Sequence, residues 1–147
     1  MTTKEWSHLP NAEHIDWVLE TLEKNPEVWG VALNAVNFDS KCALRRDALY
    51  AARRASWDAG WSAAWDAAWE ASRRASWISA SIATLSEARR AAWCAITAVI
   101  SWNSSNELLD KSVKEITKLA RAGDHAAVLL LPAVIVKNKL KDKNYDN

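Results

Sequence analysis

Tryptophan recurs at every fourth position in the middle of the chain, within the segment RRASWDAGWSAAWDAAWEASRRASW (53–77). A step of four residues turns about 40° around an α-helix. Trp57, Trp61, Trp65 and Trp69 therefore fan over about 120°, which is the width of an ordinary core-facing stripe. Most of the positions between them hold Ala, Ser or Gly. The repeat thus predicts a helix with one bulky side and one smooth side, and it places the chain in the all-α class.

We expect the bulky side to be buried. A tryptophan side chain buries about 150–250 Å², so four of them contribute about 15–25 kcal/mol before conformational entropy is subtracted. Four rings left in water would form a large apolar patch. The first prediction is therefore that the Trp stripe fills the core of a bundle. The alternative is an exposed aromatic surface for a partner.

Composition agrees with a helical domain of ordinary size. The chain has 147 residues, of which 50% are hydrophobic and 25% are charged, with three Gly and three Pro. This length suits one domain with a real core, and so few helix breakers favour helices throughout. We predict one domain over 1–147, a compact bundle of five or six helices around a long Ala/Trp-repeat helix at 41–77. Residues 1–10 and 141–147 are predicted to be flexible ends.

Capping and breaking residues give the expected boundaries. Asn11 is predicted to cap a first helix, Gly60 is tolerated inside the long helix, and Gly123 closes a helix in the left-handed conformation. Thr84 with Glu87 fits a capping box after a break at 79–84. The expected helices are 11–24, 26–36, 41–77, 84–102, 107–121 and an apolar one from 125 that is kinked or restarted at Pro132, with a buried strand there as the alternative.

Several kinds of chemistry lack a supporting pattern. His8, His14 and His125 are isolated, and no metal-ligand spacing, Gly-rich phosphate loop or nucleophile motif occurs, so we predict no metal, no cofactor and no catalytic residues. A net charge of +1 gives no general attraction to nucleic acid or anionic membrane. Cys42 and Cys94 are expected to be reduced, buried thiols, with one disulfide as the alternative. The N-terminal segment has no apolar signal region, and we expect a cytoplasmic protein without a membrane span.

Pairs of neighbouring arginines recur along the repeat and on both sides of it. The pairs stand at 45–46, 53–54, 73–74 and 89–90, and the last three open the words RRASW, RRASW and RRAAW. Arginine and tryptophan dominate protein-interface hot spots, and together they can also clamp phosphates and stack bases. The plainer interpretation is ion pairing at the edge of a bundle. The candidate partner-binding residues are Arg53, Arg54, Arg73, Arg74, Arg89, Arg90, Trp77 and Trp93.

The tract ALYAARRASWDAGWSAAWDAAWEASRRASW resembles the Ala-rich helical repeats of small bacterial and phage proteins, over about residues 44–102. Some of these belong to immunity-protein families with an all-helical fold. The resemblance implies binding to a toxin or host factor and transfers no catalytic residues. We therefore predict a non-enzymatic interaction protein, encoded by a phage or bacterium, that acts as an inhibitor or immunity-type protein and can form homo-oligomers. Nucleic-acid binding through the Arg pairs is the second hypothesis, and an enzyme or small-ligand binder with a Trp-lined pocket is the third.

Overall fold

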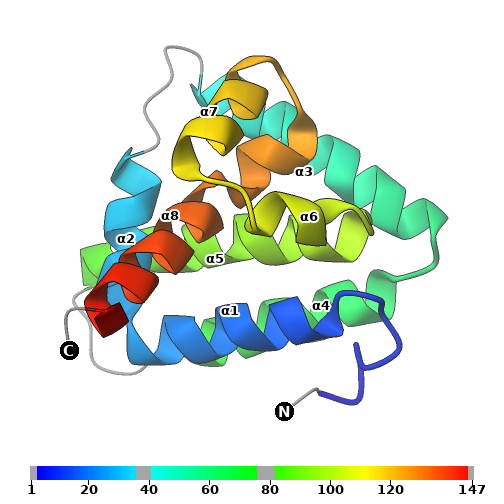
Figure 1. Cartoon of the computed structure of the whole chain (residues 1–147). Coiled ribbons are helices and arrows are strands. Elements are labelled where there is room, and N and C mark those ends of the chain that lie inside the picture. Colours follow the sequence, from blue (N-terminus) through cyan, green and yellow to red (C-terminus); the bar gives the residue numbers. More distant parts are fainter. Residues whose placement is uncertain (1–2, 36–40, 76–81, 146–147) are drawn as a thin grey trace.

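The protein is described by a computed structural model, which covers the backbone of residues 3–35, 41–75 and 82–145 and the side chains of 3–33, 44–75 and 86–141. Within these residues the fold is a bundle of eight helices without strands (Figure 1). This confirms the all-α prediction, but the helix count is higher than five or six. The helices are α1 (Ala12–Lys24), α2 (Pro26–Ala35), α3 (Lys41–Asp58), α4 (Ser62–Ala75), α5 (Ile82–Ser101), α6 (Ser105–Leu109), α7 (Val113–Arg121) and α8 (His125–Tyr145).

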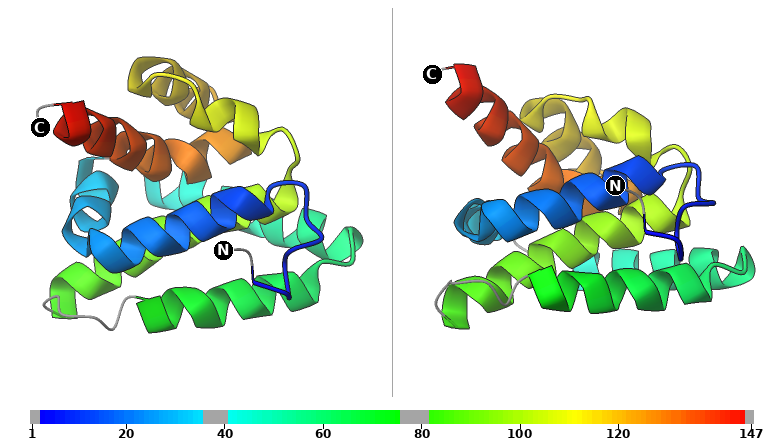
Figure 2. Two further views of the ribbon diagram at one scale, coloured as in Figure 1. Left: turned by 60° about the horizontal axis from the view of Figure 1, so that its bottom comes forward. Right: turned by 90° about the horizontal axis from the view of Figure 1, so that it is seen from below.

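The central helix is α5, which packs against α1, α2, α3, α4, α6 and α8. Figures 1 and 2 show it running through the middle of the bundle, with α1 and α4 side by side along it. Every described residue from Cys94 to Ser101 is buried. A helix that is apolar all around must be enclosed, and this stretch meets that condition better than the Trp repeat does.

The prediction of one long helix over 41–77 is wrong, because the chain turns at Gly60, between the end of α3 at Asp58 and the start of α4 at Ser62. Gly60 has φ +77 and separates α3 from α4. The Gly60 N–H donates to Trp57 O, and the Trp61 N–H donates to Ser56 O, both at 2.9 Å. This pair of hydrogen bonds is a Schellman motif with glycine in the left-handed position. A straight helix of that length would run about 55 Å and leave the core, whereas the turn lets both halves pack on α5.

A column of small residues is the most buried part of the repeat, so the prediction that the Trp stripe fills the core is wrong, although Trp61 and Trp65 are half-buried against the core. Ala64, Ala68 and Ser72 are at most 1% exposed, whereas Trp57 is 70% and Trp69 37% exposed. Small side chains allow the backbones of two helices to come close together. On α3 the same spacing buries Ala48, Ala52 and Ser56.

The tryptophans that do fill the core lie outside the repeat. Trp6 and Trp29 are at most 1% exposed. The indole N–H of Trp29 donates to Thr21 Oγ1 at 3.1 Å, and that of Trp6 donates to Asp16 Oδ1 at 2.9 Å. Buried indoles need such acceptors. Residues 3–10, which we expected to be flexible, therefore carry part of the core.

Asn11 has a different role from the predicted cap of α1, since its side chain makes no capping hydrogen bond there. Its buried amide instead donates to the carbonyl oxygens at the end of α5, at 3.2–3.3 Å from those of Val99, Trp102 and Asn103. The last carbonyls of a helix lack partners within it. Asn11 thus joins the beginning of α1 to the end of the central helix.

Other predicted boundaries differ in detail. Thr84 lies inside α5, so it is not a cap, and the helix predicted at 107–121 is divided into α6 and α7, with the observed capping box at Ser112 and Glu115. The final segment is helical through Pro132, which rules out the strand alternative and the restart. Gly123, with φ +92, closes α7 as predicted. Residues 141–145, expected to be a flexible end, continue α8. Of the predicted break at 79–84, residues 79–81 lie outside the described residues and 82–84 belong to α5.

Replacing Gly60 with alanine should lower the free energy of unfolding by about 1–2 kcal/mol, the cost of the left-handed conformation for an L side chain. A Cβ at this position meets no atom within 4 Å, so the loss comes from the backbone alone. Gly60→Asn should cost less, because asparagine tolerates this conformation. Urea denaturation measures both variants, and equal stability of wild type and Gly60→Ala would contradict the turn described above.

A larger side chain on the buried face of α4 should lower the stability of the fold much more than one on its exposed face. Ala68→Leu places extra volume where the side chain is 0% exposed, and we expect a loss of about 1–3 kcal/mol. Ala63→Leu, on the exposed side of the same helix, should change stability by less than about 0.5 kcal/mol. Thermal unfolding of the two matched variants tests this orientation of α4, and equal losses of stability would contradict it.

Candidate functional site

An exposed row of basic and aromatic side chains runs along the outer face of α3. It consists of Arg46, Tyr50, Arg53 and Trp57, and we call it the α3 stripe. The spacing i, i+4, i+7, i+11 brings these residues into one sector of about 60°. Tyr50 is 71% and Trp57 70% exposed. These are the two most exposed large hydrophobic side chains among the described residues, and they lie opposite the buried Ala face of the same helix.

Two hollows adjoin this stripe. A depression of about 490 Å³ is lined by residues of α3 alone, namely Tyr50, Arg53, Arg54, Trp57 and Asp58. A slot of about 90 Å³ lies across the Gly60 turn, between Trp57 of α3 and Trp65 of α4. The slot is smaller than the roughly 300–1,000 Å³ that ligand pockets usually have. A hollow walled by one helix is a surface on which another molecule can rest, so this region suits a macromolecule better than an enclosed ligand.

Three further tryptophans form a cluster between α4 and α5. The ring centroid of Trp93 lies 5.0 Å from that of Trp65 and 4.8 Å from that of Trp69, with interplanar angles of 88° and 71°. Edge-to-face pairs of this kind add about 0.5–1.5 kcal/mol beyond burial. Trp93 is half-buried by these contacts. Its described role is therefore to join α5 to the repeat.

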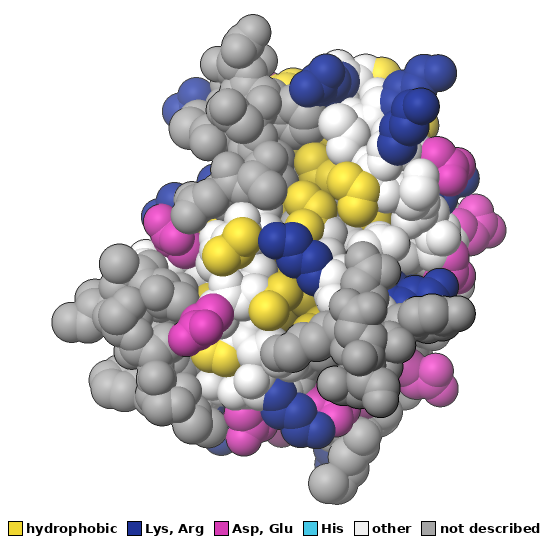
Figure 3. Space-filling view, turned by 60° about the vertical axis from the view of Figure 1, so that its left-hand side comes forward, with side chains coloured by type: hydrophobic (Ala, Val, Ile, Leu, Met, Phe, Trp, Pro, Cys, Tyr) yellow, Lys and Arg dark blue, Asp and Glu magenta, His cyan; other side chains and the backbone are white. Residues whose placement is uncertain are grey.

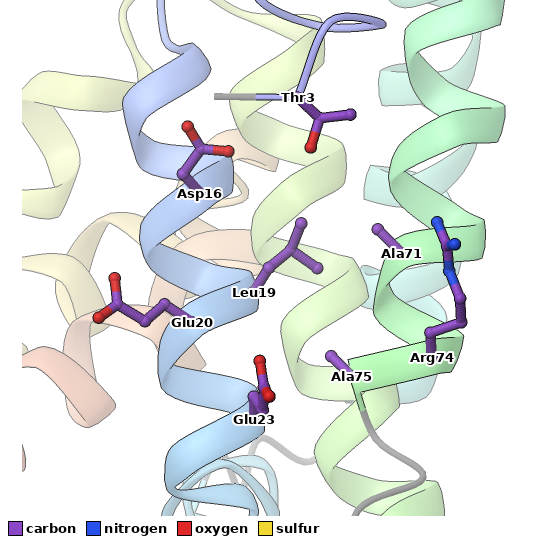
Figure 4. A pocket seen from close by; sticks show the side chains of 8 residues that line it. All are labelled: Thr3, Asp16, Leu19, Glu20, Glu23, Ala71, Arg74 and Ala75. Carbon is purple, nitrogen blue, oxygen red and sulfur yellow. The ribbon is translucent and has the colours of Figure 1, made fainter. Parts of the chain in front are cut away.

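A groove of about 600 Å³ lies between α1 and α4, and we call it the α1–α4 groove (Figure 4). Carboxylates of α1 line one wall, Arg74 belongs to the α4 wall, and Leu19 points across toward two alanines. Asp16 accepts the Trp6 hydrogen bond, and the Lys24 ammonium pairs with Glu20 at 2.8 Å, which lowers the pKa of Glu20. The groove is lined by Thr3, Asp16, Leu19, Glu20, Glu23, Ala71, Arg74 and Ala75.

The predicted site residues are spread over three helices. Arg53 and Arg54 lie exposed on α3, next to Trp57. On α4, Arg73 pairs with Glu70 at 3.1 Å, and Arg74 lines the α1–α4 groove. The remaining pair, Arg89 and Arg90, belongs to α5, where Arg89 is half-buried and Arg90 is exposed; Trp77 lies outside the described residues.

Sequence reasoning missed Tyr50 and Arg46 as site residues. Their signal was present in the sequence, since both stand at helical spacing from Arg53 and Trp57. The prediction instead selected the pairs of neighbouring arginines in and beside the Ala/Trp repeat. Neighbours in sequence point about 100° apart on a helix, so an i, i+4, i+7 search would have identified the stripe.

Cys94 is a free cysteine that is 2% exposed, as expected for a buried thiol. Burial raises its pKa to about 11, and the charges of Arg45 and Arg90 only partly oppose this. A nucleophilic cysteine requires a lowered pKa and access to solvent. Cys94 meets neither condition. The side chain of Cys42 lies outside the described part of the structure.

The described residues contain no group of three or more His, Cys, Asp or Glu side chains that could hold a metal ion. None of the helices searched combines the length and the apolar character needed to cross a bilayer. Figure 3 shows a face on which described apolar, basic and acidic side chains are interspersed. This mixture of charges provides no uniformly basic field on that face.

Comparisons with protein-family models, with curated proteins and with solved structures find no match.

The raised pKa of Cys94 predicts a loss of stability at alkaline pH. The unfolded thiol ionises near its ordinary value of 9.0 and the folded one at about 11, so the unfolded state releases its proton first. The contribution of the protonated thiol to the free energy of unfolding is complete below pH 9 and is lost as the pH rises through 11. The total loss is up to about 3 kcal/mol. Urea denaturation across this range should show a steeper decline for the wild type than for Cys94→Ala. Parallel curves would show that the thiol is not buried as described.

Proposed function

We propose that this chain is a non-enzymatic interaction protein that binds a partner protein through the α3 stripe. The observation that carries the proposal is the exposure of Tyr50 and Trp57 on either side of Arg53, on one face of one helix. Trp, Tyr and Arg are the residues most enriched at interface hot spots. Large aromatic rings bury much area when a partner covers them, and here Tyr50 is 71% and Trp57 70% exposed.

The guanidinium groups of the stripe are available for a partner. Within the described part of the chain, Arg46 and Arg53 of the stripe form no ion pair within 4.0 Å, and neither does the adjacent Arg54. A guanidinium presents several donors in a planar fork that suits carboxylates. The stripe therefore favours a partner whose surface combines apolar and acidic side chains.

A nucleic acid is a less suitable partner for this surface. Asp58 lines the depression with Arg54, and Asp66 lines the neighbouring slot. A uniformly charged phosphate backbone would pass close to these carboxylates, whereas a protein can place neutral or basic groups there. The net charge of +1 adds little long-range attraction. The resemblance of the repeat to immunity-protein families is the basis for proposing a toxin or host factor as the partner and a phage or bacterium as the source.

The experiment is affinity capture with the purified chain, followed by mass spectrometry and a direct binding measurement. Losing one hot-spot side chain costs about 2 kcal/mol, so Trp57→Ala and Arg53→Ala should each weaken binding about 30-fold. Val31→Ala on α2, which removes an exposed apolar side chain, and Lys114→Ala on α7 are the matched controls and should bind like the wild type.

Two outcomes would overturn the proposal. A partner that binds both stripe variants with unchanged affinity would show that another surface is used. Retention on DNA or RNA, with an affinity that falls steeply as salt increases, would favour the nucleic-acid hypothesis instead.

A further inference from the structure

Two surfaces of this molecule have the same spacing and opposite charge. Along α1, Asp16, Leu19 and Glu23 line the α1–α4 groove at positions i, i+3 and i+7. Read from the C-terminal end, the α3 stripe places Arg53, Tyr50 and Arg46 at the same intervals. Both sets span seven residues, which is about 10 Å along a helix. An acidic, apolar, acidic order on one helix therefore matches a basic, aromatic, basic order on the other.

We propose that a second copy of this chain lays its α3 stripe antiparallel along α1, over the α1–α4 groove. In this register Arg53 faces Asp16, Tyr50 faces Leu19, and Arg46 faces Glu23. The inference uses the surface of the proposed function but requires no foreign partner. The inference also gives a role to the α1–α4 groove, which has no other proposed function.

The apolar part of the contact agrees with this register. The groove is lined by the half-buried Leu19, Ala71 and Ala75, whose small or apolar side chains can cover the ring of Tyr50. Trp57 stands one helical turn beyond Arg53 and so extends past Asp16. Figure 4 shows Thr3 at this end of the groove, beside Asp16. The most exposed tryptophan of the repeat therefore meets the end of the groove that the N-terminal segment closes.

The charges of the groove favour a basic occupant of moderate affinity. The lining of the groove contains three carboxylates, from Asp16, Glu20 and Glu23, and one basic side chain, Arg74. Lys24 already pairs with Glu20. Exposed ion pairs are individually weak and are screened by salt. A contact of about three helical turns belongs to the small, transient class of interfaces. We therefore expect self-association that is weak and sensitive to salt.

The contact joins two different patches, so it is heterologous. A pair of copies leaves one free groove and one free stripe, and further copies can add until a ring closes. The average mass should therefore increase with protein concentration and should not stop at a dimer unless the geometry closes it.

Sedimentation velocity of the full-length chain at low salt, at micromolar and near-millimolar concentrations, tests the proposal. R46E and E23R each place like charges opposite one another and should weaken association at least 10-fold. In a mixture of the two variants, the stripe of each meets a groove of complementary charge on the other, so the mixture should recover the association that each variant loses alone. R46E combined with E23R in one chain should restore association. Lys114→Glu, on α7, is the matched charge-reversal control, and circular dichroism checks that each variant remains helical.

Each alternative outcome has a definite meaning. A wild-type chain that remains monomeric at the highest concentration and lowest salt overturns the inference. So does association that is insensitive to salt, or that R46E and E23R leave unchanged. If the chain is monomeric and a captured partner is lost with Trp57→Ala, the proposed function stands while this inference falls. If the chain assembles as described and no partner is captured, the self-association inference stands while the proposed function falls.

Discussion

The close approach of small-residue faces to the central helix is the contact on which the rest of the structure depends. Ala64 and Ala68 of α4, and Ala48 and Ala52 of α3, are buried, and both helices pack on α5, α3 also on α8 and α4 also on α1. A smooth face allows backbones to lie near each other, so many weak dispersion contacts accumulate along the length of a helix. The Ser101 hydroxyl, 2.7 Å from the carbonyl oxygen of Ala52, shows how near α3 and α5 come.

This packing explains why the tryptophans of the repeat do not fill the core. On α4 the tryptophans stand about 60° around the helix from the buried Ala64 and Ala68. Their rings therefore lie at the edge of the buried face, where Trp61 and Trp65 are half-buried. Part of the aromatic area is recovered where Trp65 and Trp69 contact Trp93 of α5. Trp57, at the end of α3, has no such neighbour among the described residues and remains 70% exposed. The exposed aromatic surface is thus a direct consequence of the small-residue core.

The candidate surfaces follow from the same geometry. The turn at Gly60 redirects α4 so that it lies along α1, and the α1–α4 groove forms between them. The outer face of α3 then carries arginine and aromatic side chains with nothing described above them. Spacing along α3 could have been predicted from the sequence, and so could the acidic face of α1. Their exposure could not, because it depends on which neighbours cover each helix.

The sequence by itself determined the all-α class, the left-handed turn at Gly123 and the two-sided character of the repeat, because local propensity and helical periodicity are properties of short segments. It did not decide which side of the repeat is buried. A helical wheel gives the angle between two faces but not the direction of the core, and both a bulky and a smooth face can pack. Only the tertiary structure made that choice. The apolar residues of α5 and α8 fill the centre, and α3 and α4 approach α5 closely through their small residues, so the tryptophan stripe is left at the edge of these contacts.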